Sequence, residues 1–308
     1  MNGSTANRAT WGQLFAIAAA YAACYELARY FTNSHWALTA GLRLACLFLV
    51  PRRFWLALVI GETLPSIENA LLHGPQFGAA WALAAAVPMV LLWIPVVGPL
   101  RRRWPLRAPD GSLRVGVLLT ATLGCAIVTA VSTTMQLEAA LMSNPGAWPE
   151  ISAYAYFWSY LLGAFLGALT LTPTVLAMHE RVSAAAALSL AQLWRSPLAR
   201  DLAAWAAPML VGLAWVAFAT DQDMLRQTAR LSLVLPMFGL AWRHGWHGSA
   251  VGGMLASIAL AMTGGELLDA SVIRCQAVLA LCISGTLLMG ARWRHRHAIA
   301  PPAAHANR

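Results

Sequence analysis

The sequence predicts an all-α protein, a polytopic transmembrane bundle of about ten helices with both termini in the cytoplasm. Three observations lead to this prediction. The chain is 59% hydrophobic and only 11% charged, whereas a soluble domain carries about 25% charged residues. Apolar runs alternate with short polar breaks along its length. Arginines gather in every second break, as in the cytoplasmic loops of membrane proteins.

The apolar runs define the expected spans. They are Trp11–Phe31, Trp36–Val50, Phe54–Leu72, Phe77–Val97, Val115–Met135, Ile151–Met178, Leu202–Thr220, Leu231–Trp242, Ser249–Met262 and Ala270–Met289. The second, eighth and ninth runs are short for a hydrocarbon core of about 30 Å. They are tilted, broken or re-entrant helices in this interpretation, and a count of about eight spans is the alternative.

The distribution of arginine sets the orientation. With the N-terminus inside, the inner breaks hold Arg52, Arg53, Arg101, Arg102, Arg103, Arg107, Arg114, Arg181, Arg195, Arg200 and Arg243. The outer breaks hold Glu138, Glu150, Asp221, Asp223, Glu266 and Asp269, with Arg226 and Arg230 as their basic residues. Since losing one span would invert half of this alternation, the pattern supports an even number of spans.

The expected organisation is a single integral membrane domain over residues 1–308. Residues 11–178 form the first group of spans and residues 201–292 the second. Between them, residues 179–200 are apolar in part but too short to cross, which is typical of an interfacial helix at the inner surface. Residues 293–308 form an Arg- and His-containing cytoplasmic tail.

Charged residues inside apolar runs are the candidate ligand-binding residues, because a charge in the bilayer is costly unless it is paired or lines a polar cavity. They are Glu26, Arg29, Arg43, Glu62, Glu68 and Arg274. One interpretation is a charge-paired brace. A second is a pocket in the outer half that binds a small polar or anionic ligand, with Arg29, Arg43 and Arg274 as anion contacts. A proton or ion pathway is the third.

No catalytic, cofactor or metal motif stands out. The five cysteines form no CxxC pair, and His244 and His247 lack a third ligand in the sequence around them. Nucleotide-binding loops and the usual hydrolase motifs do not occur. The net charge of +9 follows from the inner loops and does not indicate nucleic-acid binding. We therefore expect no enzymatic activity, no cofactor and no metal.

Three stretches resemble a known bacterial family. They are residues 35–62 (HWALTAGLRLACLFLVPRRFWLALVIGE), residues 157–173 (FWSYLLGAFLGALTLTP) and residues 235–292, which begin LPMFGLAWRHGWHGSAV and include Gln276. In this order they resemble the first membrane-associated sensor domain family (MASE-type). The resemblance implies a multi-pass sensory domain of the bacterial inner membrane, which signals through a histidine kinase, a diguanylate cyclase or a partner transporter.

The leading hypothesis is a stand-alone membrane sensor or signalling-accessory protein, because no output domain is expected after residue 292. Ligand binding in the outer half would shift the bundle between two arrangements, and the Arg-rich inner loops would pass the change to a partner. The rival hypothesis is a small-molecule transporter or permease, since short paired spans and buried charges also suit transport.

Overall fold

Helices joined by short loops make up the described part of the chain. The computed structural model describes residues 3–32, 36–109, 111–146, 151–184, 195–263 and 270–299. These ranges contain no β-strand, although an isolated bridge pairs Arg107 with Leu113. The predicted all-α class is confirmed.

Several predicted features lie outside the described residues. They are the outer-loop acids Glu150, Glu266 and Asp269, residues 185–194 of the expected interfacial segment, and the tail beyond residue 299.

The chain divides into two compact units. The first unit comprises Met1–Trp104 and Thr120–Thr172, and the second comprises Pro105–Leu119 and Pro173–Arg308. The long helices α6 (Val115–Ser143) and α7 (Ala153–Ala184) contribute to both units. The division therefore falls within α6, between Leu119 and Thr120, and within α7, between Thr172 and Pro173.

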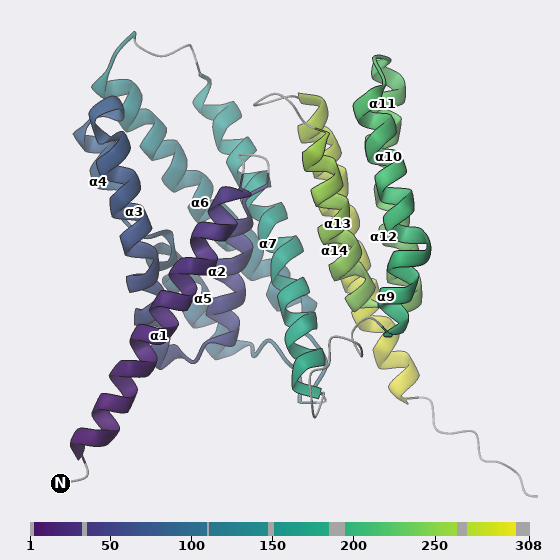
Figure 1. Ribbon diagram of the computed structural model, residues 1–308, viewed down its shortest axis with the longest axis horizontal. Coiled ribbons are helices and arrows are strands. Elements are labelled where there is room, and N and C mark those ends of the chain that lie inside the picture. The colour runs from purple at the N-terminus through teal and green to yellow at the C-terminus, as the bar shows by residue number, and fades with distance from the viewer. Residues whose placement is uncertain are drawn as a thin grey trace, which may run out of the picture. The chain divides into compact units, whose positions relative to one another are not determined.

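The first unit contains α1 (Gly3–Tyr30), α2 (Leu38–Leu49), α3 (Trp55–Phe77), α4 (Ala79–Ala85) and α5 (Met89–Arg103), with a short 3-10 turn, η1 (Arg52–Phe54), before α3. In this unit, α1, α2 and α3 run in alternating directions, and α4 and α5 together return in the direction opposite to α3 (Figure 1). Proline ends two of these elements, because its ring lacks an N–H and disfavours helix for the preceding residue. Pro51 follows α2, and Pro88 separates α4 from α5.

Helix α2 is the buried centre of the first unit. Nine of its 12 residues are buried, including Leu44 and Leu47, which are fully enclosed. At a rise of about 1.5 Å per residue it is only about 18 Å long, shorter than the hydrocarbon core. A short helix is tolerated here because neighbouring helices, and not lipid, surround it.

In the second unit, several of the elements join into longer helical stretches. Its elements are α9 (Pro197–Asp201), η2 (Leu202–Ala206), α10 (Ala207–Ala219), α11 (Asp223–Ser232), α12 (Val234–His244), α13 (Trp246–Met262) and α14 (Ala270–Ile299). η2 is a π-helical turn that ends two residues before Pro208, whose missing N–H interrupts the regular hydrogen bonds. Gly245, at a φ of 62°, makes the tight turn between α12 and α13.

The two other runs that were predicted to be short spans, Leu231–Trp242 and Ser249–Met262, belong to longer helices in the structure. The run Leu231–Trp242 is part of a longer helical stretch, since only Leu233 separates α11 from α12. Asp223, Arg226 and Arg230 therefore lie on a helix, and their place on the outer side of the membrane stays a prediction. The run Ser249–Met262 begins earlier, at Trp246, and α13 has 17 residues.

Length and hydropathy identify the clearest membrane-crossing candidates. Within the described residues, Val115–Ser143, Ala153–Ser183, Pro197–Ala219 and Ser271–Ala291 qualify, and α4 with α5, bent by 43°, qualifies if the pair is one span. These helices are consistent with a polytopic bundle. The expected total of about ten spans is not tested by this criterion.

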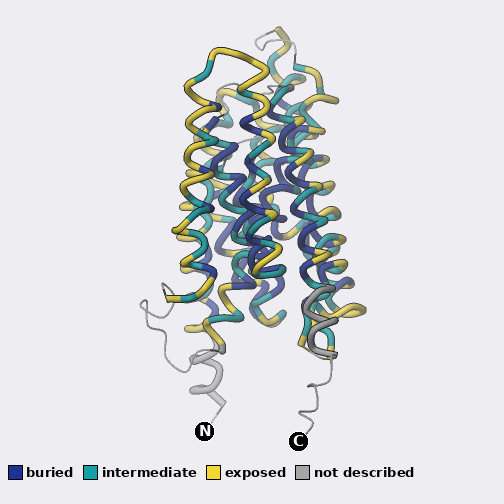
Figure 2. Tube along the Cα trace, turned by 90° about the vertical axis from the view of Figure 1, so that its right-hand side faces the viewer, coloured by how far each residue is buried: buried dark blue, intermediate teal, exposed yellow. Residues whose placement is uncertain are grey.

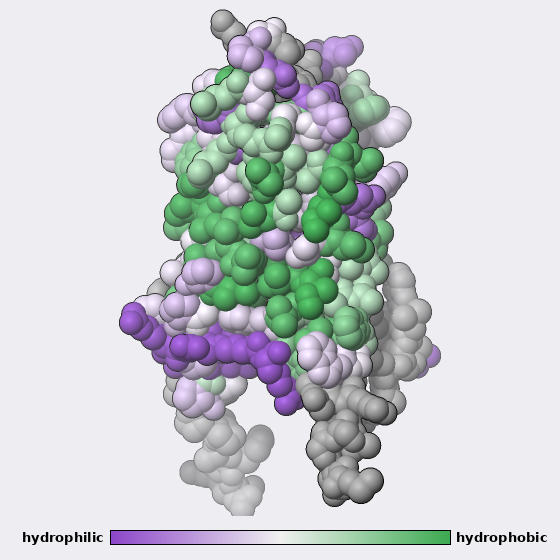
Figure 3. All heavy atoms as spheres, turned by 90° about the vertical axis from the view of Figure 1, so that its left-hand side faces the viewer, coloured by the Kyte–Doolittle hydropathy of each residue, from purple (hydrophilic) through white to green (hydrophobic). Residues whose placement is uncertain are grey.

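The helix surfaces are those of a protein surrounded by lipid. Buried residues follow the helix faces that neighbours cover, and exposed residues follow the opposite faces (Figure 2). Large apolar side chains are nevertheless exposed, among them Leu64, Leu83 and Leu281. On the face of the first unit seen in Figure 3, hydrophobic residues form a broad band above a row of strongly hydrophilic ones. An apolar belt with a charged border matches a bilayer and its interface.

Candidate functional site

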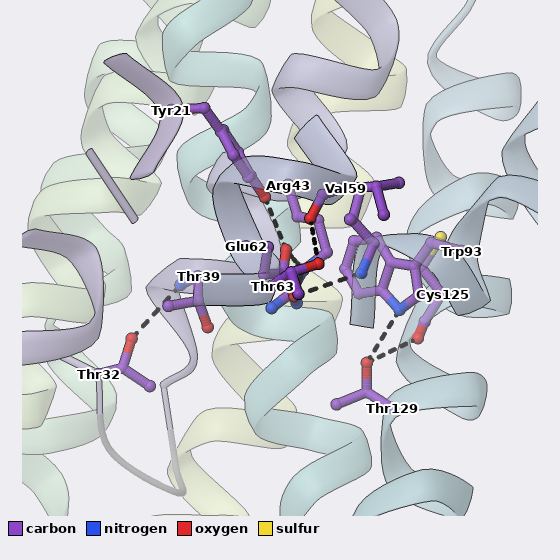
Figure 4. Close-up of polar contacts among 11 residues, drawn as sticks. Tyr21, Thr32, Thr39, Arg43, Val59, Glu62, Thr63, Trp93, Cys125 and Thr129 are labelled. Carbon is purple, nitrogen blue, oxygen red and sulfur yellow. Dashed lines mark hydrogen bonds and ion pairs between the residues drawn. The ribbon is translucent and has the colours of Figure 1, made fainter. Parts of the chain in front are cut away.

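Glu62 on α3 is the meeting point of four helices of the first unit. Its side chain is fully buried, and its carboxylate accepts hydrogen bonds from α1, α2 and α5 (Figure 4). Tyr21 Oη donates to Oε2 at 2.8 Å, and the backbone N–H of Val90 donates to Oε1 at 3.3 Å. Arg43 Nε lies 2.9 Å from Oε2 and 3.1 Å from Oε1.

Arg43 on α2 is the positive partner of this carboxylate. The residue is 4% exposed, and its guanidinium carbon lies 5.0 Å from the Trp93 ring centre and 5.6 Å from that of Tyr25. The aromatic faces stabilise the cation where water is absent. Its hydrogen bonds to described residues all use Nε, so the two terminal nitrogens make none there.

The break between α4 and α5 places a helix N-terminus at Glu62. Pro88 caps α5 in an extended conformation, and Val90 is among the first residues of that helix, whose N–H groups have no intrahelical partner. The carboxylate of Glu62 accepts one of these N–H groups. A negative charge is favourable at this position because it also opposes the positive end of the helix dipole.

Trp93 extends the network to α6. Its Nε1–H donates to Thr129 Oγ1 at 3.2 Å, and the Thr129 hydroxyl donates in turn to the Cys125 carbonyl at 3.0 Å (Figure 4). Trp93 is completely buried. The polar atoms around Arg43 and Glu62 are thus held in place by further hydrogen bonds and not only by the ion pair.

Polar residues lie along the contact between α1 and α3, from the Arg43–Glu62 centre toward the surface, and we call this row of residues the polar seam. Tyr21, Tyr25 and Arg29 are spaced by four residues and share one face of α1. Arg29 Nη2 donates to Asn69 Oδ1 on α3 at 3.4 Å, and its Nη1 lies 3.2 Å from Glu26 Oε1. The Glu26 and Arg29 side chains are 47% and 35% exposed. The seam therefore connects the buried pair to a more open ion pair one to two helical turns away.

The six candidate residues are not gathered at one point. Arg43 and Glu62 form the centre, and Glu26 and Arg29 form the exposed end of the seam. Glu68 is exposed on α3, and Arg274 is exposed on α14 in the second unit. The structure thus supports a paired centre in the first unit, while the role proposed for Glu68 and Arg274 remains a prediction.

Sequence reasoning missed several partners. Tyr21, Tyr25 and Trp93 carry no charge, and nothing in a single apolar run distinguishes them from packing residues; only the four-residue spacing of Tyr21, Tyr25 and Arg29 was a usable signal. Arg230 was also missed as a buried charge. It is 6% exposed on α11 and donates to Ser271 Oγ at 2.9 Å and to the Thr263 carbonyl.

Two of the stretches that resemble the sensor family pack against each other. Gly41 on α2 faces Gly167 on α7, and neither position leaves space for a side chain. Trp36 Nε1 donates to Thr170 Oγ1 at 3.1 Å, and Thr172 Oγ1 donates to the Gly41 carbonyl at 3.0 Å. The small-residue step on α2 and the glycines of α7 are therefore the two sides of one helix contact, which positions α2 and with it Arg43.

Comparison with known proteins gives one family. The family model described as MASE1 matches residues 9–297. No curated protein and no solved structure shows significant similarity to the chain.

Proposed function

Since the chain belongs to the MASE1 family of membrane sensory domains, we propose that it senses a small polar or anionic ligand through the Arg43–Glu62 centre and signals to a partner. The observation that carries this proposal is the guanidinium of Arg43. It is buried, yet its terminal nitrogens make no hydrogen bond with described residues. These two nitrogens are therefore able to donate to an incoming anion, which would gain two strong, charge-assisted contacts.

Ligand access follows the seam between α1 and α3. Glu26 and Arg29 stand at its exposed end, and Tyr25 lies between them and Arg43. Arg29 attracts an anion, and Arg43 receives it deeper in the unit. In the proposed orientation, with the N-terminus inside, this opening lies in the outer half of the membrane.

The response is a shift between two arrangements of α2. An anion that shares Arg43 weakens its contact with Glu62, which also holds α1 and α5. The ligand can shift the equilibrium only by its difference in affinity for the two arrangements. The paired state seen here is the unliganded arrangement in this proposal.

The end of α2 connects this shift to the Arg-rich loops. Arg101 Nη1 donates to the carbonyls of Leu47 and Val50 at 2.7 and 2.8 Å, and Arg52 Nη2 donates to the Gly98 carbonyl at 2.9 Å. These bonds join the C-terminal end of α2 to α5. Any displacement of α2 is therefore passed to the segment that carries Arg102 and Arg103, both exposed.

The partner reads this basic surface at the cytoplasmic side. A histidine kinase, a diguanylate cyclase or a transporter suits a sensory domain of this family. The proposed setting is the bacterial inner membrane, with about ten spans and both termini in the cytoplasm.

The test is anion binding to the purified protein in nanodiscs, measured by calorimetry with inorganic phosphate, sulfate and succinate. We expect saturable binding of at least one anion to the wild type. The double variant Arg43→Gln, Glu62→Gln removes both charges and keeps a polar side chain at each position, and it should bind none. Arg53→Gln, at an exposed position of η1, is the matched control. Equal binding by the double variant and the wild type contradicts the proposal.

One observation favours transport as the second candidate. Helices α4 and α5 form a bent pair, and the N-terminal end of α5 contacts the Glu62 carboxylate. Transporters place such discontinuous helices at their substrate sites. Uptake of a radiolabelled anion into proteoliposomes that depends on Glu62 would favour this candidate over sensing.

A further inference from the structure

A cavity of about 810 Å³ lies in the second unit, whereas the Arg43–Glu62 centre belongs to the first. Its walls come from the end of α7, from α9, from the turn between α12 and α13, and from α14. This volume is within the usual range for ligand sites, about 300–1,000 Å³. The stretch of sequence around the α12–α13 turn, WRHGWHG, forms much of the wall.

Basic groups outnumber acids at one side of the cavity. Asp201 accepts from Arg243 Nη1 at 2.9 Å and lies 2.8 Å from His244 Nε2. Glu180 lies 3.6 Å from Arg107 Nη2 and 3.8 Å from His247 Nε2. Arg181 also lines the cavity. With Arg107, Arg181 and Arg243 against two carboxylates, the cluster keeps a positive charge even when both histidines are neutral.

Other residues that line the cavity are apolar and exposed. Phe238 and Trp242, four residues apart on one face of α12, are 43% and 72% exposed, and Met289 on α14 is 62% exposed. All three line the cavity. An exposed Trp beside Arg and His is typical of the level where a helix leaves the hydrocarbon core.

We propose that this cavity binds an anionic phospholipid, whose headgroup carries a net negative charge. Arg243 and Arg181 contact the phosphate, and Phe238 and Trp242 contact the acyl chains. Charge complementarity and the exposed apolar lining together favour this occupant. Basic pockets between transmembrane helices suit anionic headgroups, and a free phosphate would gain nothing from contact with Phe238, Trp242 and Met289. This site is independent of the ligand site proposed in the first unit.

Helix α14 would respond to a lipid bound in the cavity. Thr286, Met289 and Gly290 of α14 line the cavity, and Gly290 lies so close to the backbone of Trp246 that a side chain there would collide with it. A lipid bound at the α12–α13 turn therefore contacts α14 directly and holds it in place against α13.

The experiment uses the delipidated protein and native mass spectrometry with equal amounts of phosphatidylglycerol and phosphatidylcholine. We expect the wild type to retain the anionic lipid about fivefold over the zwitterionic one, the discrimination that one interfacial Arg provides. Arg243→Gln, at a side chain 58% exposed, should remove this preference. Trp242→Ala should lower retention of both lipids. Arg226→Gln, an Arg of α11 paired with Asp223 and outside this cavity, is the matched control and should behave as the wild type.

A second arm distinguishes a lipid from a free anion. Inorganic phosphate is added to the protein in nanodiscs of phosphatidylcholine alone, and the unfolding temperature is measured. No stabilisation by phosphate, with stabilisation by phosphatidylglycerol, supports the proposal. Stabilisation by phosphate that Arg243→Gln abolishes would show a free-anion site and overturn it, and so would equal retention of both lipids by the wild type.

Discussion

The backbone carbonyl of Ala37 occupies the place where a Cβ on Gly167 would stand. The two segments touch through main-chain atoms, and the N–H of Ala37 donates to the Gly163 carbonyl at 3.1 Å. Close contact between small residues is a common way to join helices in a membrane, where no hydrophobic force drives their association. This contact fixes the start of α2, five to six residues before Arg43.

Gly167→Ala should therefore destabilise the first unit. Overpacking of this kind costs about 1–3 kcal/mol, and it separates α2 from α7. Gly212→Ala, on α10 with open space around the added methyl group, is the control and should stabilise its helix by a few tenths of a kcal/mol to about 1 kcal/mol. Thermal unfolding in detergent measures both. A Gly167→Ala protein as stable as the control would contradict the tight contact.

Glu62→Gln should be strongly destabilising, because it leaves the Arg43 cation buried without its counter-charge. Breaking one side of a buried pair costs about 3–5 kcal/mol. The double variant Arg43→Met, Glu62→Met removes both charges and should recover most of this loss. Denaturant titration of the three proteins gives the comparison, and a double variant no more stable than Glu62→Gln would argue against a directly coupled pair.

Arg101→Gln should weaken the connection between α2 and α5. The guanidinium donates to two carbonyls at the C-terminal end of α2, and hydrogen bonds to a charged group contribute about 1.5–3 kcal/mol each at most. Arg103→Gln, at an exposed neighbouring position, should have little effect. Hydrogen exchange of the amides at the end of α2 is the measurement, with faster exchange expected only in the first variant.

Gly245→Ala should destabilise the turn between α12 and α13. Gly245 has φ and ψ of 62° and −142°, a region that is essentially restricted to glycine and costs other residues about 1–3 kcal/mol. The unfolding temperature should fall. The lipid preference proposed for the second unit should weaken as well, because the same turn lines that cavity. An unchanged unfolding temperature would show that the turn adapts.

The sequence alone was sufficient for the fold class and for the two residues at the centre of the site. Membrane-spanning runs can be recognised without tertiary information, because each span must satisfy its own backbone polar groups and be apolar enough for lipid. Arg43 and Glu62 stand out for the same reason, since each is a charge in an apolar run. The family resemblance identified the sensory class, which the match over residues 9–297 confirms.

Only the tertiary structure decided which charges pair, because pairing depends on contacts between distant residues. Arg43 and Glu62 are 19 positions apart, and Tyr21 is 41 positions from Glu62. Arg230 looked like a loop residue because it directly precedes the apolar run that begins at Leu231. The structure instead continues α11 into α12, and the ends of α13 and α14 accept hydrogen bonds from Arg230. Hydropathy is a local property, whereas burial is set by the helices that happen to surround a residue. That is also why α2, too short for a bilayer, is stable at the centre of its unit.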